Sequence, residues 1–148
     1  MYKHFDNYTL IDHAKPGATS RQVYKGILSG RASAAFFGKI NVRKDAQKTD
    51  ASQKNKNLLL SKEAKVDTRP QLEISADDVK CAHGAAVGQL DEEEVFYLRS
   101  RGMSEAVARK VLTHGFAHEV IDAITVEPVK THMTNFLEKR LGGKGLED

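Results

Sequence analysis

The spacing of apolar residues changes near residue 90, and this change constrains the fold more than any other feature of the chain. Before it, apolar and polar residues alternate in short stretches, as in half-buried β-strands. After Asp91, apolar residues recur at helical spacing almost to the end. The sequence therefore predicts a mostly β part over residues 1–90 and a helical domain over residues 91–148.

Alternation is clearest in two stretches of the first part. One places Phe36, Gly38, Ile40 and Val42 on a common face, and the other does the same for Leu72, Ile74 and Ala76. Further strands are predicted over residues 8–11, 22–28, 57–60 and 79–82. Turn-forming pairs such as Ser29-Gly30, Lys44-Asp45, Arg69-Pro70 and Asp77-Asp78 separate them. No helical pattern lies between the strands, so a sandwich, a barrel and a β-helix are all compatible with this part.

The second part predicts three helices. Asp91 is suited to cap the first, which Gly102 ends. Ser104 and Glu105 begin a second helix that runs to about Ile124. Its apolar residues cover more than one narrow stripe, so more than one of its sides must be buried. A third helix over residues 129–141 follows Pro128 and ends at Gly142-Gly143.

Composition excludes several classes of protein. The 148 residues, of which 40% are hydrophobic, suffice for one ordinary core, and no apolar run is long enough to span a membrane. One cysteine allows no internal disulfide. Residues 1–70 carry 14 Lys and Arg against 6 Asp and Glu, so a basic nucleic-acid-binding domain is one alternative. However, no nucleic-acid-binding motif is recognisable, and we expect neither a nucleic-acid nor a membrane partner.

Two pairs of residues could ligate a metal. Cys81 and His83 are two apart and share a face of a strand, and His114 and His118 are four apart on a helix. Taken alone, both pairs fit packing roles better, since a cysteine in an apolar strand usually behaves as a small hydrophobic residue. A standalone metal-dependent enzyme using these four residues is a second alternative. The chain has no phosphate-binding loop and no nucleophile elbow, and we predict no catalytic residue.

Several uncommon strings, in order, carry a family resemblance that extends from about Gly30 to Val120. They are Gly38-Lys39-Ile40-Asn41-Val42, Gln47-Lys48-Thr49-Asp50-Ala51, Asn57-Leu58-Leu59-Leu60-Ser61, Val66 to Ile74, Asp77 to Gly84, and Phe96 to Gly102. With these strings the chain resembles the SufB/SufD family of iron–sulfur cluster assembly scaffolds, and the SufD branch most. The single cysteine also favours SufD over SufB.

The resemblance implies a right-handed parallel β-helix, of which residues 1–90 would be the C-terminal coils, followed by a small helical bundle. Residues 47–56 would be called a flexible linker on composition, whereas the resemblance makes them part of a coil with polar ladders. Family members are longer, so the chain is expected to be a C-terminal fragment. A β-helix cut at Met1 would expose an unpaired coil and invite self-association.

The resemblance also implies a function. The chain would be a noncatalytic scaffold subunit that pairs with a SufB-like subunit through the end of the β-helix and with a SufC-like ABC ATPase through the helical domain. His83 matches the histidine of the family's K-C-S-H-G motif, with Ala82 in place of its serine, and would be a metal ligand shared with the partner. Cys81 is a neighbour of that site. No cofactor would be held tightly by this chain alone, and an iron–sulfur cluster or iron would be transient cargo.

In the helical domain the residues expected to contact the ATPase are Phe96, Tyr97, Arg99, Arg101, Val111 and Phe116. The expected compartment is the cytoplasm, or the plastid stroma in a eukaryote.

Overall fold

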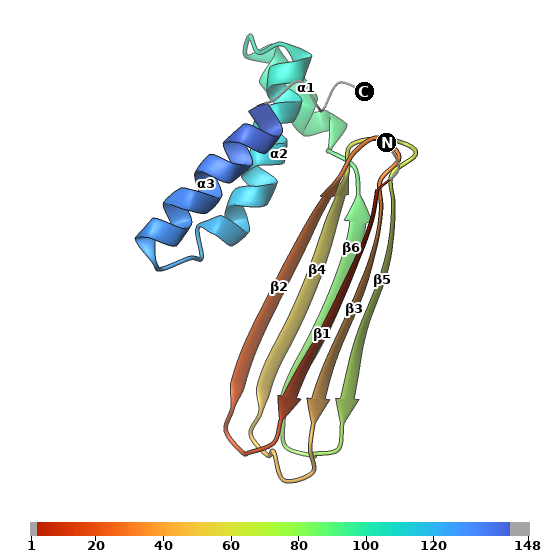
Figure 1. The fold of residues 1–148 in the computed structure, drawn as a ribbon, viewed down its shortest axis with the longest axis vertical. Coiled ribbons are helices and arrows are strands. Elements are labelled where there is room, and N and C mark those ends of the chain that lie inside the picture. The colour runs from red at the N-terminus through yellow and green to blue at the C-terminus, as the bar shows by residue number, and fades with distance from the viewer. Residues whose placement is uncertain (1–2, 143–148) are drawn as a thin grey trace.

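The computed structural model describes residues 3–142, which form six strands followed by three helices (Figure 1). The strands are β1 (His4–His13), β2 (Thr19–Leu28), β3 (Ser33–Val42), β4 (Asp50–Leu59), β5 (Lys65–Ile74) and β6 (Lys80–Gly88). The helices are α1 (Glu92–Ser100), α2 (Glu105–Ile121) and α3 (Glu127–Gly142). The predicted order, mostly β and then helical, is therefore confirmed.

The strands form two parallel sheets, and the chain alternates between them. One sheet has the order β1-β3-β5 and the other β2-β4-β6, with every neighbouring pair parallel. The arrowheads of the two sheets point in opposite directions, so each strand returns along the one before it (Figure 1). His4 pairs with Ser33 and Ser33 with Lys65, which gives a structural repeat of about 30 residues.

Inward and outward residues alternate as predicted in β3. Phe36, Gly38, Ile40 and Val42 are buried between the sheets, whereas their neighbours are only half-buried. The apolar core lies toward the turns that follow β1, β3 and β5. It is built from Ile40, Val42, Ala46, Ala51 and Ala76, with Ile11, Leu72, Val79 and Cys81 packed against it.

A polar layer continues this core along β4. Gln53, Asn55 and Asn57 are at most 7% exposed. Asn55 Oδ1 accepts hydrogen bonds from Asn57 Nδ2 (2.6 Å) and Thr68 Oγ1 (2.7 Å), which offsets the cost of burying the amide. The flexible-linker interpretation of residues 47–56 is therefore wrong, because most of this segment lies in the central strand β4.

Some element boundaries differ from the prediction. Pro70 does not break β5, because β5 is an edge strand and a missing N–H is tolerated there. The second helix ends at Ile121 and not near Ile124, since a short turn precedes α3. Gly143, predicted to help end the third helix, lies outside the described residues.

The predicted cap at Asp91 is present, and Ser104, predicted only to begin the second helix, also acts as a cap. The Asp91 side chain accepts the Glu93 N–H (2.8 Å), and Ser104 accepts the Val107 N–H (3.3 Å). Gly102 ends α1 with a φ of 93°, a conformation that favours glycine.

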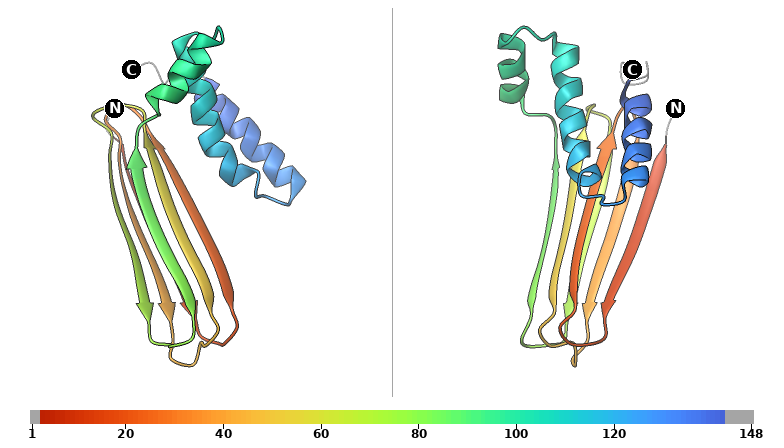
Figure 2. Two further views of the ribbon diagram at one scale, coloured as in Figure 1. Left: turned by 180° about the vertical axis from the view of Figure 1, so that it is seen from behind. Right: turned by 90° about the vertical axis from the view of Figure 1, so that its left-hand side faces the viewer.

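The helices lie at one end and on one side of the sheets (Figures 1 and 2). α1 continues from β6 beyond the strand ends, and α2 and α3 run back as a pair beside β2. α2 packs against α1, α3 and β2, which satisfies the predicted need to bury more than one side. Within residues 3–142, no helix is long and apolar enough to cross a membrane.

Candidate partner interface at the uncovered end of the sheets

Cys81 and His83 lie on β6, the last strand of its sheet. β6 pairs only with β4, and β5 pairs only with β3, so these two strands form an uncovered end of the stack. The register places Cys81 beside Ala51 and His83 beside Gln53. Ala51 and Gln53 are buried between the sheets, so Cys81 and His83 belong to the same inward-facing row.

The two residues occupy different layers of this row. Cys81 is half-buried and packs against the apolar core. His83 is exposed and continues the polar layer of Gln53. The packing interpretation of Cys81 thus agrees with its surroundings, while His83 presents its imidazole at the surface of the uncovered end.

A missing side chain on β3 makes room for the polar layer. A Cβ atom at Gly38 would overlap Gln53 Nε2 and lie 2.7 Å from two ring atoms of Phe36. Gly38 pairs with Pro70 of β5 in register. The glycine therefore allows the Gln53 amide to lie between the sheets, next to the row that ends at His83.

Neither predicted pair forms a metal centre by itself. His114 and His118 stack with ring centroids 6.2 Å apart. Among the described residues no group of three or more His, Cys, Asp or Glu side chains converges on a common point. Cys81, His83, His114 and His118 are therefore not brought together as the standalone-enzyme alternative requires.

Ion pairs engage some of the basic side chains of the first half. Arg21 pairs with Asp50 (2.7 Å), Arg43 with Asp12 (2.5 Å) and Arg69 with Asp67 (2.8 Å). The hydrogen bond from Arg43 lowers the pKa of Asp12, and that from Arg21 lowers the pKa of Asp50. Pairing within the chain leaves fewer free cations, which disfavours the nucleic-acid alternative.

The residues expected to contact an ATPase separate into two groups. Phe96 and Tyr97 are 71% and 54% exposed, and Arg101 lies over the Tyr97 ring, 4.6 Å from its centroid. Arg99 and Val111 are also exposed. Phe116 is different, because its ring is half-buried beneath the Lys25 ammonium of β2. Phe116 therefore belongs to the contact between helix and sheet.

Lys25 was not singled out from the sequence. Its side chain is 4% exposed, and Nζ donates to the Phe116 carbonyl (2.8 Å) and to the Glu119 carboxylate. The latter hydrogen bond lowers the pKa of Glu119. Only the alternation of β2, which turns Lys25 outward, could have indicated that it faces a neighbouring element.

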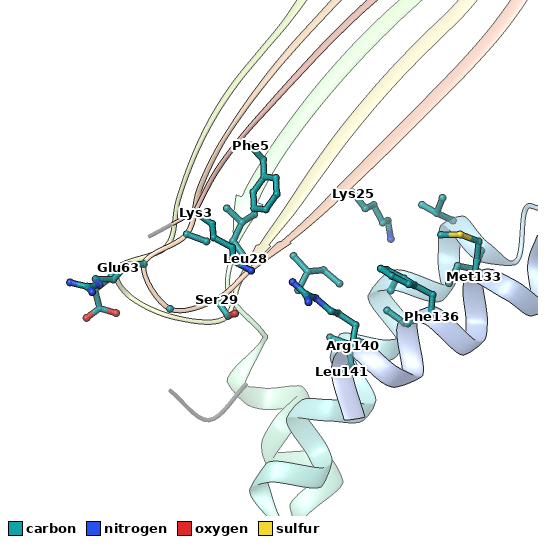
Figure 3. Close-up of a pocket in the computed structure, with 18 residues that line it drawn as sticks. Lys3, Phe5, Lys25, Leu28, Ser29, Glu63, Met133, Phe136, Arg140 and Leu141 are labelled. Carbon is teal, nitrogen blue, oxygen red and sulfur yellow. The ribbon is translucent and has the colours of Figure 1, made fainter. Parts of the chain in front are cut away.

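A groove of about 960 Å³ lies beside this contact, between the start of β1, the end of β2 and the helices α2 and α3 (Figure 3). Phe5, Met133, Phe136 and Leu137 supply apolar surface, and Lys3, Arg31 and Arg140 supply positive charge. None of the predicted site residues lines it, so the groove is separate from the uncovered end at His83.

Comparison with known proteins identifies the family. The family model "SUF system FeS cluster assembly, SufBD core domain" matches residues 1–116. The chain is 46% identical over 138 residues to the iron–sulfur cluster assembly protein SufD of Escherichia coli, covering 93% of this chain and 33% of the relative. It is 45% identical over 119 residues to a SufBD family protein of Synechocystis, covering 80% of this chain and 26% of the relative.

A chloroplastic protein of Arabidopsis thaliana is 38% identical over 130 residues, covering 87% of this chain and 27% of that protein. The chain thus spans about a third or less of the length of these relatives. The SufBD core model matches most of the chain, and the 46% identity to a SufD indicates the branch of the family. The chain belongs to the SufB/SufD family of iron–sulfur cluster assembly proteins, on its SufD side.

Proposed function

We propose that the chain is a noncatalytic scaffold segment of a SufBCD-type iron–sulfur cluster assembly complex. Its partners would be a SufB-like subunit and a SufC-like ABC ATPase, and an iron–sulfur cluster or iron would be transient cargo. The observation that carries the proposal is the uncovered end of the sheets, where the exposed His83 lies in register beside the buried Gln53.

We further propose that the paired sheets are the last coils of a parallel β-helix, and that residues 1–90 and 91–148 are two domains. Three features support the coil: parallel pairing throughout, the alternation of strands between sheets, and the repeat of about 30 residues. The SufB-like partner would then cover β5 and β6. Burying such an edge removes the unpaired backbone groups that otherwise invite aggregation.

The ligand count supports a shared site. One imidazole and one thiol are too few ligands for a cluster, since tetrahedral iron and zinc sites use four. His83 would supply one ligand from this side, and thiolates of the partner would complete the set. Cys81 is half-buried in the neighbouring apolar layer and would mainly support the strand.

The ATPase would contact α1 and the exposed side of α2. Phe96, Tyr97, Arg99, Arg101 and Val111 remain available there, whereas Phe116 is covered by Lys25. ATP-driven movement of α1 and α2 would reach the sheets through the contact between Lys25 and Glu119. The role belongs in the cytoplasm, or in the plastid stroma of a eukaryote. Self-association through β1 and β2, the edges opposite His83, would compete with assembly.

Co-purification with SufB-like and SufC-like partners tests the proposal, with wild type compared to His83→Ala. His132→Ala is the matched control, because His132 is an exposed histidine on α3. We expect all three proteins to retain the complex and His83→Ala alone to lose cluster assembly. A wild-type chain that recovers neither partner, or a His83→Ala complex that assembles clusters normally, would contradict the proposal.

A further inference from the structure

Gln53 is buried beside His83 and has one hydrogen-bonding atom without a partner. The residue is 0% exposed, and its Oε1 receives no hydrogen bond from the described residues. A buried carbonyl without a donor costs about 1–3 kcal/mol, so native structures rarely retain one. This unpaired atom lies in the layer that ends at His83.

The hydrogen bonds of this layer run in one direction. Gln22 Nε2 donates to Thr9 Oγ1 (2.9 Å), and Gln53 Nε2 donates to Gln22 Oε1 (2.6 Å). Each amide therefore donates toward the β1 and β2 side of the stack. The series ends at the carbonyl oxygen of Gln53, which has no donor among the described residues. Gln53 pairs in register with Gln22 of β2 on one side and with His83 of β6 on the other.

Two features limit the freedom of the Gln53 amide. The space left by Gly38 receives it, and a Cβ there would overlap Nε2. Gln22 holds that nitrogen on the opposite side from β6. The carbonyl oxygen thus has a fixed position at the edge of the polar layer, and it can only accept a hydrogen bond.

We infer that Gln53 is a positioning residue for His83: its Oε1 accepts the N–H of one imidazole nitrogen and so fixes the tautomer and orientation of the ring. The second nitrogen then carries its lone pair toward the uncovered end, where it can bind a metal or accept a proton. Histidines that ligate metals commonly donate their other ring N–H in this way. The inference rests on the proposed role of His83 and adds the residue that prepares it.

Nitrogen-15 NMR of the histidine rings tests the inference on the chain alone, without partners or metal. Long-range proton–nitrogen spectra distinguish the two tautomers, and loss of its signals in His83→Ala identifies the His83 ring. We expect a single tautomer of the His83 ring. Its ring N–H should exchange with solvent about tenfold more slowly than that of the exposed His132, because a hydrogen bond of about 1.4 kcal/mol slows exchange by that factor.

Gln53→Met keeps the length of the side chain but removes the acceptor, so the His83 ring should become a mixture of tautomers with rapid exchange. Gln71→Met is the matched control, since Gln71 is exposed on the outward face of β5. If Gln53→Met fails to fold, the wild-type spectrum still decides. Averaged tautomers in wild type, or an unchanged ring in a folded Gln53→Met, would overturn the inference.

This outcome is separable from that of the proposed function. An averaged His83 ring in a chain that still forms the complex and loses cluster assembly on His83→Ala would reject only the role of Gln53. A single tautomer in a chain that binds neither partner would uphold Gln53 and reject the scaffold role.

Discussion

Lys25 Nζ on β2 lies 4.2 Å from the centroid of the Phe116 ring on α2 and also donates to the Phe116 carbonyl. Together with the ion pair to Glu119, this contact joins the helices to the outer face of a sheet. Three interactions therefore converge on one ammonium group, which makes it a sensitive point for mutation.

Lys25→Met should lower the free energy of unfolding by about 1–3 kcal/mol, because hydrogen bonds to charged groups are lost from a buried position. Amide hydrogen exchange should accelerate in α2 more than in β3. Lys54→Met is the control, since Lys54 is exposed on β4. Denaturant titration of the three proteins measures the effect, and equal stability of Lys25→Met and Lys54→Met would contradict it.

Gly38→Ala should destabilise the chain by about 1–3 kcal/mol, the usual cost of overpacking a core. The added methyl group would overlap the Gln53 amide and contact the Phe36 ring. Gly84→Ala provides the comparison, because a Cβ there meets no atom within 4 Å. Its effect should remain within about 0.5 kcal/mol. Thermal unfolding measures both variants, and a Gly84→Ala variant that is destabilised as much as Gly38→Ala would contradict the prediction.

His114 should make the stability depend on pH near neutrality. Burial lowers its pKa below the usual 6.5, the nearby Lys110 and His118 lower it further, and Glu138 opposes them. The unfolded chain therefore binds a proton first as the pH falls, and stability declines below about pH 6.5. His114→Gln should flatten the curve of unfolding free energy between pH 7.5 and pH 5.5, and His132→Gln should not. If unfolding free energy depends on pH equally in wild type and His114→Gln, His114 is not the cause of the dependence.

Carboxylates should cause a second loss of stability at lower pH. Hydrogen bonds from arginine lower the pKa of Asp12 and Asp50, and one from Lys25 lowers that of Glu119. Their contribution is complete above the unfolded values of 3.8 and 4.5 and is lost as the pH falls through the folded values. Asp50→Asn should therefore lose less stability than wild type between pH 5 and pH 3. Asp45→Asn is the comparison, because Asp45 is exposed in the turn between β3 and β4.

Phe96→Ala and Val95→Ala should separate binding from folding on α1. Phe96 is 71% exposed and Val95 is 2% exposed. We expect Phe96→Ala to weaken capture of the SufC-like ATPase with stability unchanged. Val95→Ala should lower stability by about 1–3 kcal/mol through lost burial. Undiminished ATPase capture by Phe96→Ala would remove α1 from the proposed contact.

The elements predicted best from the sequence are those with strong local signals. The alternation in β3, the cap at Asp91 and the start of the second helix at Ser104 are confirmed, because inward burial and helix capping depend on nearby residues. In the region of β4, alternation alone predicted strand only over residues 57–60, and residues 47–56 were placed in a coil only by the family resemblance, since Gln53 and Asn55 are stabilised by partners far away in sequence. The contact of Lys25 with α2 was missed for the same reason, because no local pattern specifies it.

The candidate site was predicted in part. The two-residue period of a strand correctly placed Cys81 and His83 on the same face of β6. The structure adds that Cys81 packs against the apolar core, whereas His83 adjoins the polar layer at Gln53. The role of Gln53 depends on the register between strands and on the gap at Gly38, and neither is visible in a single strand.

The near-constant strand length has a consequence for how such a chain can tolerate insertions and deletions. Five strands have 10 residues and β6 has 9, while the connecting turns differ in length. One residue inserted at the start of β4 would exchange its two faces, exposing Gln53 and burying Lys54, because side chains alternate with a period of two. The same residue inserted in a turn would change only the local path. Viable length changes should therefore be confined to the turns.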